Sequence, residues 1–271
     1  MRKMFQGLIG ILLTLFIAQP GFTQNKDVKQ ASSKQSSTLK TMTWTTKSEA
    51  AKKLASEGSD YFLNIELPQA YEKFKEALKL DPDFTVALVF MANLTQGEVK
   101  KEYSQRAVKS AANKTDGEKL FASVVKEGAT RETNRDTWEK LHTMFPDGGM
   151  IGNFYVVTRA TPEERFKAAQ DYIQKFPDNA NMYNTIAYYY MLDKKDMGKA
   201  KECFEKYLKL YPSGYNPFDS MGEYYLNAGD MANAKKYYTM AVERYPFSTS
   251  SVEALQKMND DAKKQVAEKQ Q

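Results

Sequence analysis

Asp219 and Glu223 are the residues whose spacing most directly suggests chemistry, because side chains four residues apart share one face of a helix. Two carboxylates on one face could bind a cation or act as a general acid and a general base. On an exposed helix, such a pair is far more often a solvated surface. The chain has no Asp-x-Asp-x-Asp-Gly loop that would support calcium binding. We therefore predict no metal site.

The single histidine and the single cysteine restrict the other kinds of catalysis. His142 is the only residue that could complete a Ser-His-Asp set, and no Gly-x-Ser-x-Gly motif accompanies it. One histidine and one cysteine cannot form a zinc cluster, and no Gly-rich loop followed by Lys-Ser or Lys-Thr indicates a nucleotide. Cys203 stands beside Phe204 and is expected to be a small buried apolar residue. The sequence predicts a protein that is not an enzyme and has no cofactor.

The N-terminus has the pattern of a secretory signal peptide. A basic start is followed by the apolar run from Leu8 to Ala18, which ends before Pro20. A membrane anchor would need about 20 apolar residues, so this run is too short. We expect residues 1–23 to be removed by cleavage between Thr23 and Gln24. The mature protein would then be soluble and periplasmic or secreted, without membrane insertion.

The charge pattern argues against nucleic acid as a partner. The net charge of +5 falls to +3 when Arg2 and Lys3 leave with the signal peptide. The remaining basic residues alternate with acidic ones, as in the segment 193–196, which is typical of a solvated helix surface. With one cysteine no intrachain disulfide is possible, so the stability of the exported chain must come from packing.

The elements that carry these residues follow from five prolines. Pro82, Pro146, Pro177, Pro212 and Pro246 each close an amphipathic helical stretch. The last three are 35 and 34 residues apart, and the first two are 64 apart, which is about two units. A period of this length indicates a solenoid of stacked helical hairpins. We predict an all-α fold of about six antiparallel hairpins.

Small and aromatic residues recur at fixed places within each unit. The sets are Gly58, Tyr61, Ala70, Phe74, Ala77 and Pro82 in a unit counted from Ala51, Gly222, Tyr225, Ala234, Tyr238, Ala241 and Pro246 in one counted from Tyr215, and Tyr188, Met191, Ala200, Phe204, Tyr207 and Pro212 in one counted from Asn181. This pattern resembles the tetratricopeptide repeat (TPR), whose small residues let two helices approach closely. In the unit from Asn181, Tyr188 and Tyr207 replace small residues, which predicts a wider helix crossing.

The remaining segments complete the predicted organisation. Residues 24–46 are rich in Ser, Thr, Lys and Gln and are predicted to be a flexible linker, and residues 47–259 form the TPR solenoid. The spacings Thr161 to Glu164 and Ser250 to Glu253 both predict capping boxes that open helices. The second of these helices should cap the last hairpin, and residues 260–271 should be a charged tail with a frayed end.

The resemblance implies a binding function. In TPR proteins the first helix of each hairpin lines a concave groove, and its contact positions can be transferred to this chain one by one. The predicted partner-binding residues are Ser59 and Phe62 in the first unit, Thr185 and Tyr189 in the fifth, and Asp219, Glu223 and Asn227 in the last. Ala55 and Ser59 stand where chaperone-binding TPR domains have the Lys and Asn that grip a C-terminal carboxylate, so that ligand is disfavoured.

We therefore expect a non-enzymatic scaffold or adaptor of the bacterial cell envelope that binds a protein or peptide in its groove. Two alternatives stay open. The chain could be an accessory subunit of a secreted envelope hydrolase, or a subunit of an outer-membrane assembly or secretion complex.

Overall fold

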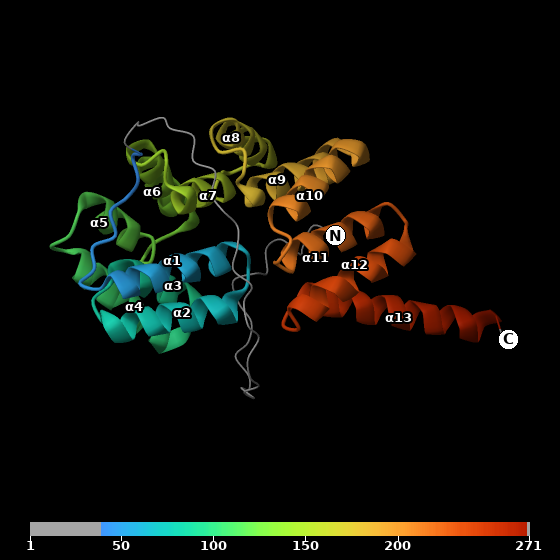
Figure 1. Ribbon diagram of the computed structural model, residues 1–271, viewed down its shortest axis with the longest axis horizontal. Coiled ribbons are helices and arrows are strands. Elements are labelled where there is room, and N and C mark those ends of the chain that lie inside the picture. The colour runs from blue at the N-terminus through green and yellow to red at the C-terminus, as the bar shows by residue number, and fades with distance from the viewer. Residues whose placement is uncertain (1–38, 270–271) are drawn as a thin grey trace. The chain divides into compact units, whose positions relative to one another are not determined.

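The computed structural model describes residues 39–269, and within them the chain forms α-helices, one π-helical segment and no strand. Successive helices pair as six hairpins, and one further helix follows (Figure 1). The prediction of an all-α solenoid of about six hairpins with a C-terminal helix is confirmed. The helices are α1 (Glu49–Leu63), α2 (Leu67–Leu80), α3 (Thr85–Leu94), α4 (Gly97–Ala111), α5 (Asp116–Ser123), α6 (Arg131–Met144), α7 (Gly149–Val157), α8 (Pro162–Lys175), α9 (Ala180–Tyr188), the π-helix η2 (Tyr189–Lys194), α10 (Met197–Leu210), α11 (Asn216–Asn227), α12 (Met231–Arg244) and α13 (Thr249–Lys269).

Close approach of the two helices of a hairpin depends on glycine in the first and last hairpins. A Cβ atom added to Gly58 would lie 3.0 Å from Phe74 Cζ, and one added to Gly222 would lie 2.7 Å from Tyr238 Cδ1. Each aromatic ring thus fills the space that a side chain would occupy. Phe74 is fully buried and Tyr238 nearly so. The small and aromatic positions of the repeat therefore interlock as the sequence pattern predicts.

The hairpin of α9 and α10 is built differently. Tyr188 stands at the place of Gly222, and its ring meets the Phe204 ring edge-on, with centroids 5.1 Å apart. The π-helix begins at the next residue and ends before Lys195, which adopts a left-handed conformation with φ of 57°. A π-helical turn accommodates an extra residue within a helix. We attribute it to the bulky tyrosine at this position.

The solenoid ends at α13, which contacts α12 and α11. The helix begins at Thr249, so Ser250 and Ser251 lie in its first turn and donate hydrogen bonds to Asp219 of α11. The predicted capping box at Ser250 is therefore wrong, whereas the predicted box at Thr161 is present. The helix continues to Lys269, beyond the predicted start of a frayed tail at residue 260.

An extended segment, residues 39–48, lies against the N-terminal hairpins. The Thr45 N–H and hydroxyl donate to the Glu118 carboxylate at 2.9 and 2.8 Å, and the Thr46 hydroxyl donates to Asp81 at 2.6 Å. Met42 of this segment is buried. Residues 39–46 were predicted to belong to a flexible linker, and the structure differs because these polar residues find carboxylate partners. The rest of the predicted linker and the predicted signal peptide lie outside the described residues.

The loop between α1 and α2 touches the C-terminal hairpins. Glu66 accepts a hydrogen bond from the Tyr211 hydroxyl at 3.1 Å, although the two residues are 145 positions apart. Ile65 packs on the apolar cluster that contains Tyr215 and Tyr245. Its φ of 65° is unusual for a β-branched residue and costs roughly 1–3 kcal/mol, which this packing must offset. First and last hairpins are thus held together.

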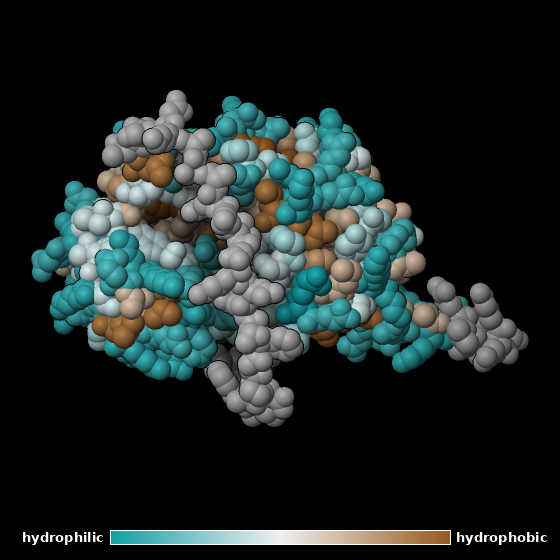
Figure 2. Space-filling view, viewed as in Figure 1, coloured by the Kyte–Doolittle hydropathy of each residue, from teal (hydrophilic) through white to brown (hydrophobic). Residues whose placement is uncertain are grey.

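The described surface is mainly polar. Figure 2 shows teal, hydrophilic residues over most of the visible face, with separate brown patches between them. The exposed large apolar residues come from many elements, for example Leu80 of α2, Val157 of α7 and Phe247 before α13. None of the described helices has both the length and the apolar character needed to cross a membrane.

Candidate binding cavity on the first helices

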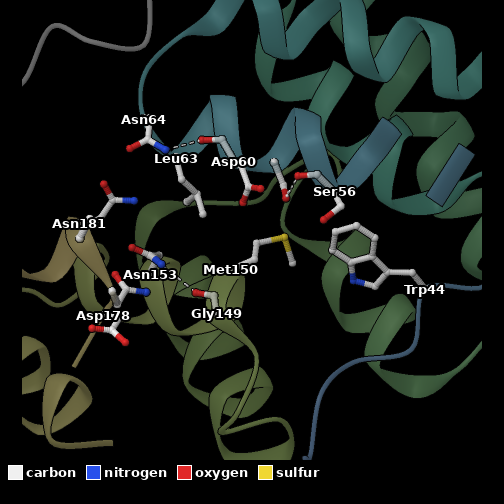
Figure 3. Close-up of a pocket in the computed structure, with 13 residues that line it drawn as sticks. Trp44, Ser56, Asp60, Leu63, Asn64, Gly149, Met150, Asn153, Asp178 and Asn181 are labelled. Atoms are coloured by element: carbon white, nitrogen blue, oxygen red, sulfur yellow. Dashed lines mark hydrogen bonds between the residues drawn. The ribbon is translucent and has the colours of Figure 1, made fainter. Parts of the chain in front are cut away.

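A cavity of about 360 Å³ opens between α1, α7 and the segment that leads into α9. Ser56, Ser59 and Asp60 line it from α1, and Met150 and Asn153 line it from α7 (Figure 3). The start of α9 also contributes, and α1, α7 and α9 are each the first helix of a hairpin. The cavity therefore lies on the side of the solenoid that the repeat pattern assigns to a groove.

Small residues allow the helices that form the cavity walls, α1 and α7, to pack closely against the helices behind them. In α1, Ala51 and Ala55 are fully buried, which lets α2 and α3 pack closely behind the cavity-lining side. In α7, a Cβ atom on Gly152 would overlap the Tyr172 ring, so glycine is needed for α8 to approach. The helices that carry the polar lining are therefore fixed from behind by packing rather than by contacts across the cavity.

The polar lining includes hydrogen-bond acceptors that have no partner among the described residues. Asn64 and Asn153 each use the amide N–H group for a carbonyl oxygen in their own helix, at 2.8 Å in both cases, which leaves their Oδ1 atoms available. The Oδ1 atom of Asn179 is buried and has no hydrogen-bond partner among the described residues. Asp60 and Asp178 add carboxylates from opposite walls (Figure 3). Among the described residues, no Lys, Arg or His lines the cavity.

The carboxyl of Asp60 is electrostatically unusual. Partial desolvation, with the neighbouring Glu57 carboxylate adding to it, raises the pKa of this group. Neither Asp60 nor Asp178 forms a hydrogen bond or ion pair through its side chain with any other residue of the described chain. Both carboxylates are therefore available to an incoming cationic donor.

The extended N-terminal segment supplies the remaining wall. Trp44 lines the cavity, and its ring lies 6.4 Å from the Phe84 ring. The next residue, Thr45, is bonded to Glu118, which is fully buried. The position of the indole ring therefore depends on the attachment of this segment to α5.

Part of the chain matches a known repeat. A family model described as "Tetratricopeptide repeat" matches residues 180–213 and 219–247. The first match covers α9 to α10 and the second α11 to α12. The fold is a TPR solenoid.

Solved structures of other TPR solenoids are similar in fold. PilF from Pseudomonas aeruginosa is 15% identical, with 77% of this chain and 98% of that chain covered and a TM-score of 0.42. PilW, a type IV pilus biogenesis factor, is 14% identical, with 77% and 99% covered and a TM-score of 0.42. A TPR protein of Thermus thermophilus is 17% identical, with 77% and 98% covered and a TM-score of 0.37. No curated protein sequence matches this chain.

The predicted groove residues of the first and fifth hairpins differ in what they offer. Ser59 lines the cavity but is only 4% exposed. Phe62 packs against Phe90 with ring centroids 5.0 Å apart. Thr185 is partly exposed. Tyr189 is 5% exposed and stacks on Phe166 at 4.1 Å, so in this solenoid it contributes mainly to packing.

The predicted residues of the last hairpin form a separate polar cluster. Asp219 is 8% exposed and receives the Ser250 and Ser251 hydroxyls of α13. Glu223 accepts a hydrogen bond from the Tyr188 hydroxyl at 2.8 Å. Burial raises the pKa of both carboxyls. Asn227 is exposed at the end of α11.

The structure thus brings Asp219 and Glu223 together as the helix spacing predicts, but inside the solenoid. The described residues hold no group of three or more His, Cys, Asp or Glu side chains suited to a metal ion. His142 is half-buried and stacks on Tyr155 at 4.2 Å. Burial lowers the pKa of its imidazole, and the positive charges of Arg159 and Lys175 contribute to the same shift.

The other cavity residues could not be recognised from the repeat pattern. Asp60 follows Ser59 directly, and Asn153 lies in a degenerate repeat where the register is hard to assign. Asp178 and Asn179 follow Pro177 in the turn before α9, so they have no position in a helix pattern. Only the excess of Asn and Asp in the turn at 178–181 could have indicated a polar site there.

Proposed function

We propose that this protein is a non-enzymatic scaffold of the bacterial cell envelope that binds a segment of a partner protein in its concave cavity. One observation supports this most directly. Three first helices that are distant in sequence, α1, α7 and α9, converge on one cavity in which the amide oxygens of Asn64 and Asn153 have unused hydrogen-bonding capacity. A bound peptide would satisfy these groups. The signal-peptide pattern supports export.

The cavity suits an extended segment better than a small metabolite or a folded domain. Its volume of about 360 Å³ is near the lower limit of ligand pockets, which span roughly 300–1,000 Å³. That space holds one or two side chains with their backbone. The amide oxygens of Asn64 and Asn153 could accept hydrogen bonds from the N–H groups of such a backbone.

The test is a crosslinking capture experiment from the cell envelope with the mature protein as bait. Ser56→Trp would fill the cavity and Asn227→Trp would block the exposed end of α11. Each should weaken capture by about 1–2 kcal/mol, the usual scale for contact residues. Lys209→Trp and Lys236→Trp, on the exposed sides of second helices, are the matched controls. If the controls abolish capture and the cavity variants do not, the binding face is the convex one and the proposal fails.

A further inference from the structure

The cavity has one chemical property that its role in peptide binding does not by itself require. Its polar lining holds two carboxylates and several amide oxygens but no cationic side chain from residues 39–269. We propose that it binds the guanidinium group of an arginine presented by a protein segment, with lysine as a weaker substitute. This inference rests on the proposed function and specifies the ligand.

Charge complementarity is the first argument. Asp60 on α1 and Asp178 in the turn before α9 line the cavity from different elements (Figure 3). Lys73 pairs with the nearby Glu57 at 2.7 Å, but no cation of the described chain pairs with Asp60 or Asp178. A cation between them would be attracted by both.

The balance of donors and acceptors is the second argument. The side-chain oxygens of Asn64 and Asn153 receive no hydrogen bond from the described residues. A guanidinium group carries five N–H donors and no acceptor, so it matches a lining of acceptors on several sides.

The aromatic wall is the third argument. Trp44 lines the same cavity, and a cation over the face of an indole ring is attracted by about 0.5–2 kcal/mol. A planar guanidinium group can also stack on that ring, which an ammonium group cannot do equally well. This wall favours arginine over lysine and over a metal ion.

The experiment uses the Trp44 indole N–H signal in the NMR spectrum of the mature protein, assigned by its loss in Trp44→Phe. The probe is the peptide acetyl-Gly-Ser-Arg-Ser-Gly-amide, and its twin carries uncharged citrulline in place of arginine. The arginine peptide should shift the Trp44 signal in a saturable manner with a Kd in the millimolar range or below. The citrulline peptide should shift it little. Equal binding of the two peptides would overturn the proposal.

Variants connect the binding to the two carboxylates. The double substitution Asp60→Asn and Asp178→Asn should weaken binding of the arginine peptide by about tenfold or more. Asp171→Asn, on the exposed surface of α8, is the matched control and should bind normally. Ser56→Arg, which places a guanidinium group at the cavity from α1 itself, should also abolish peptide binding. Unchanged binding in both the double variant and Ser56→Arg would contradict the proposal.

Two further additions test other cations. Free arginine amide should bind more weakly than the peptide, because it lacks the flanking backbone. Calcium ions should not compete with the peptide. Saturable binding of calcium at Trp44, or free arginine amide binding as tightly as the peptide, would overturn the assignment to a protein segment. Partner capture that is insensitive to the double variant would leave the scaffold proposal intact and refute only this inference.

Discussion

The extended segment 39–48 and the C-terminal helix α13 are attached to the solenoid by the same type of anchor. At the N-terminal end the extended segment 39–48 donates hydrogen bonds to Asp81 and Glu118. At the C-terminal end α13 donates two serine hydroxyls to Asp219. All three carboxylates are nearly or fully buried. In both places a buried carboxylate fixes an element that lies outside the paired helices of the repeats.

The two anchors differ in electrostatics. Burial raises the pKa of Asp219, and the two serine hydroxyls only partly oppose this. Burial also acts on Asp81, but the Thr46 hydroxyl and the N–H groups of Lys47 and Asp83 outweigh it and lower the pKa. A buried carboxylate thus favours its charged form where hydrogen-bond donors outweigh desolvation, as at Asp81, and its neutral form where desolvation outweighs them, as at Asp219.

The largest effect is expected from breaking the N-terminal anchor. Glu118 is fully buried and accepts hydrogen bonds from both the N–H and the hydroxyl of Thr45 and of Thr115. Glu118→Ala would leave these donors without a partner and detach the segment that carries Trp44. The free energy of unfolding in urea should fall by about 3 kcal/mol.

The control for this prediction is Glu127→Ala, because Glu127 is exposed in the loop before α6. It should change stability by less than about 0.5 kcal/mol. If Glu118→Ala were as mild as the control, the segment 39–48 would not be part of the folded solenoid.

A second comparison concerns the hairpins at the two ends. A Cβ atom added to Gly222 would lie 2.7 Å from Tyr238, whereas one added to Gly58 would lie 3.0 Å from Phe74. Gly222→Ala should therefore destabilise by about 1–3 kcal/mol, and Gly58→Ala by less, because its neighbour has to move less. Gly198→Ala is the control, since its nearest neighbour would be 3.5 Å away. The reverse order in thermal melts would show that the last hairpin has the looser packing.

These end hairpins also show what the sequence reveals about the fold. The spacing of Gly222, Tyr238 and Pro246 predicts the hairpin because each residue acts locally. The glycine lets the two helices approach closely, the tyrosine ring fills the space between them, and the proline ends the second helix. The same positions in the α9–α10 hairpin predict a wider crossing from Tyr188. The π-helix that follows could not be predicted, because the spacing of small and aromatic residues does not indicate a change of helix type.

The candidate site was harder to predict, because its residues come together only through tertiary structure. Asp60 and Asp178 are 118 positions apart in the sequence but line the same cavity, and the pattern within one repeat gives no information about residues in different repeats. Tyr189 and Asp219 were predicted at the groove from their helix positions, yet both are nearly buried. Their polar groups are used by Glu163 and by the serines of α13. The repeat positions therefore indicate which side of a helix a residue lies on, but not which residues of other helices or loops pack against it.

The smallest effects, and the most direct test of the contrast between the two anchors, concern pH. The pKa of Asp219 is raised above its ordinary 3.8, so its favourable contribution is complete below that value and is lost as the pH rises through the raised pKa. The pKa of Asp81 is lowered, so its contribution is present above 3.8 and is lost as the pH falls through the lowered pKa. The stability of the two end anchors should therefore depend on pH with opposite signs.

Asp219→Asn and Asp81→Asn should reveal these signs in urea unfolding between pH about 3 and about 7. Relative to the unaltered protein, Asp219→Asn should become more favourable as the pH rises, and Asp81→Asn should become less favourable. Comparing each variant with the unaltered protein cancels the titration of distant carboxylates such as Asp147. The titration of Glu223 does not cancel, because the charge of Asp219 contributes to the raised pKa of Glu223. Removing that charge lowers the Glu223 pKa, which changes the stability difference of Asp219→Asn with pH in the same direction. Parallel pH profiles for the two variants would show that the two carboxylates share one electrostatic environment, contrary to the hydrogen bonds that distinguish them.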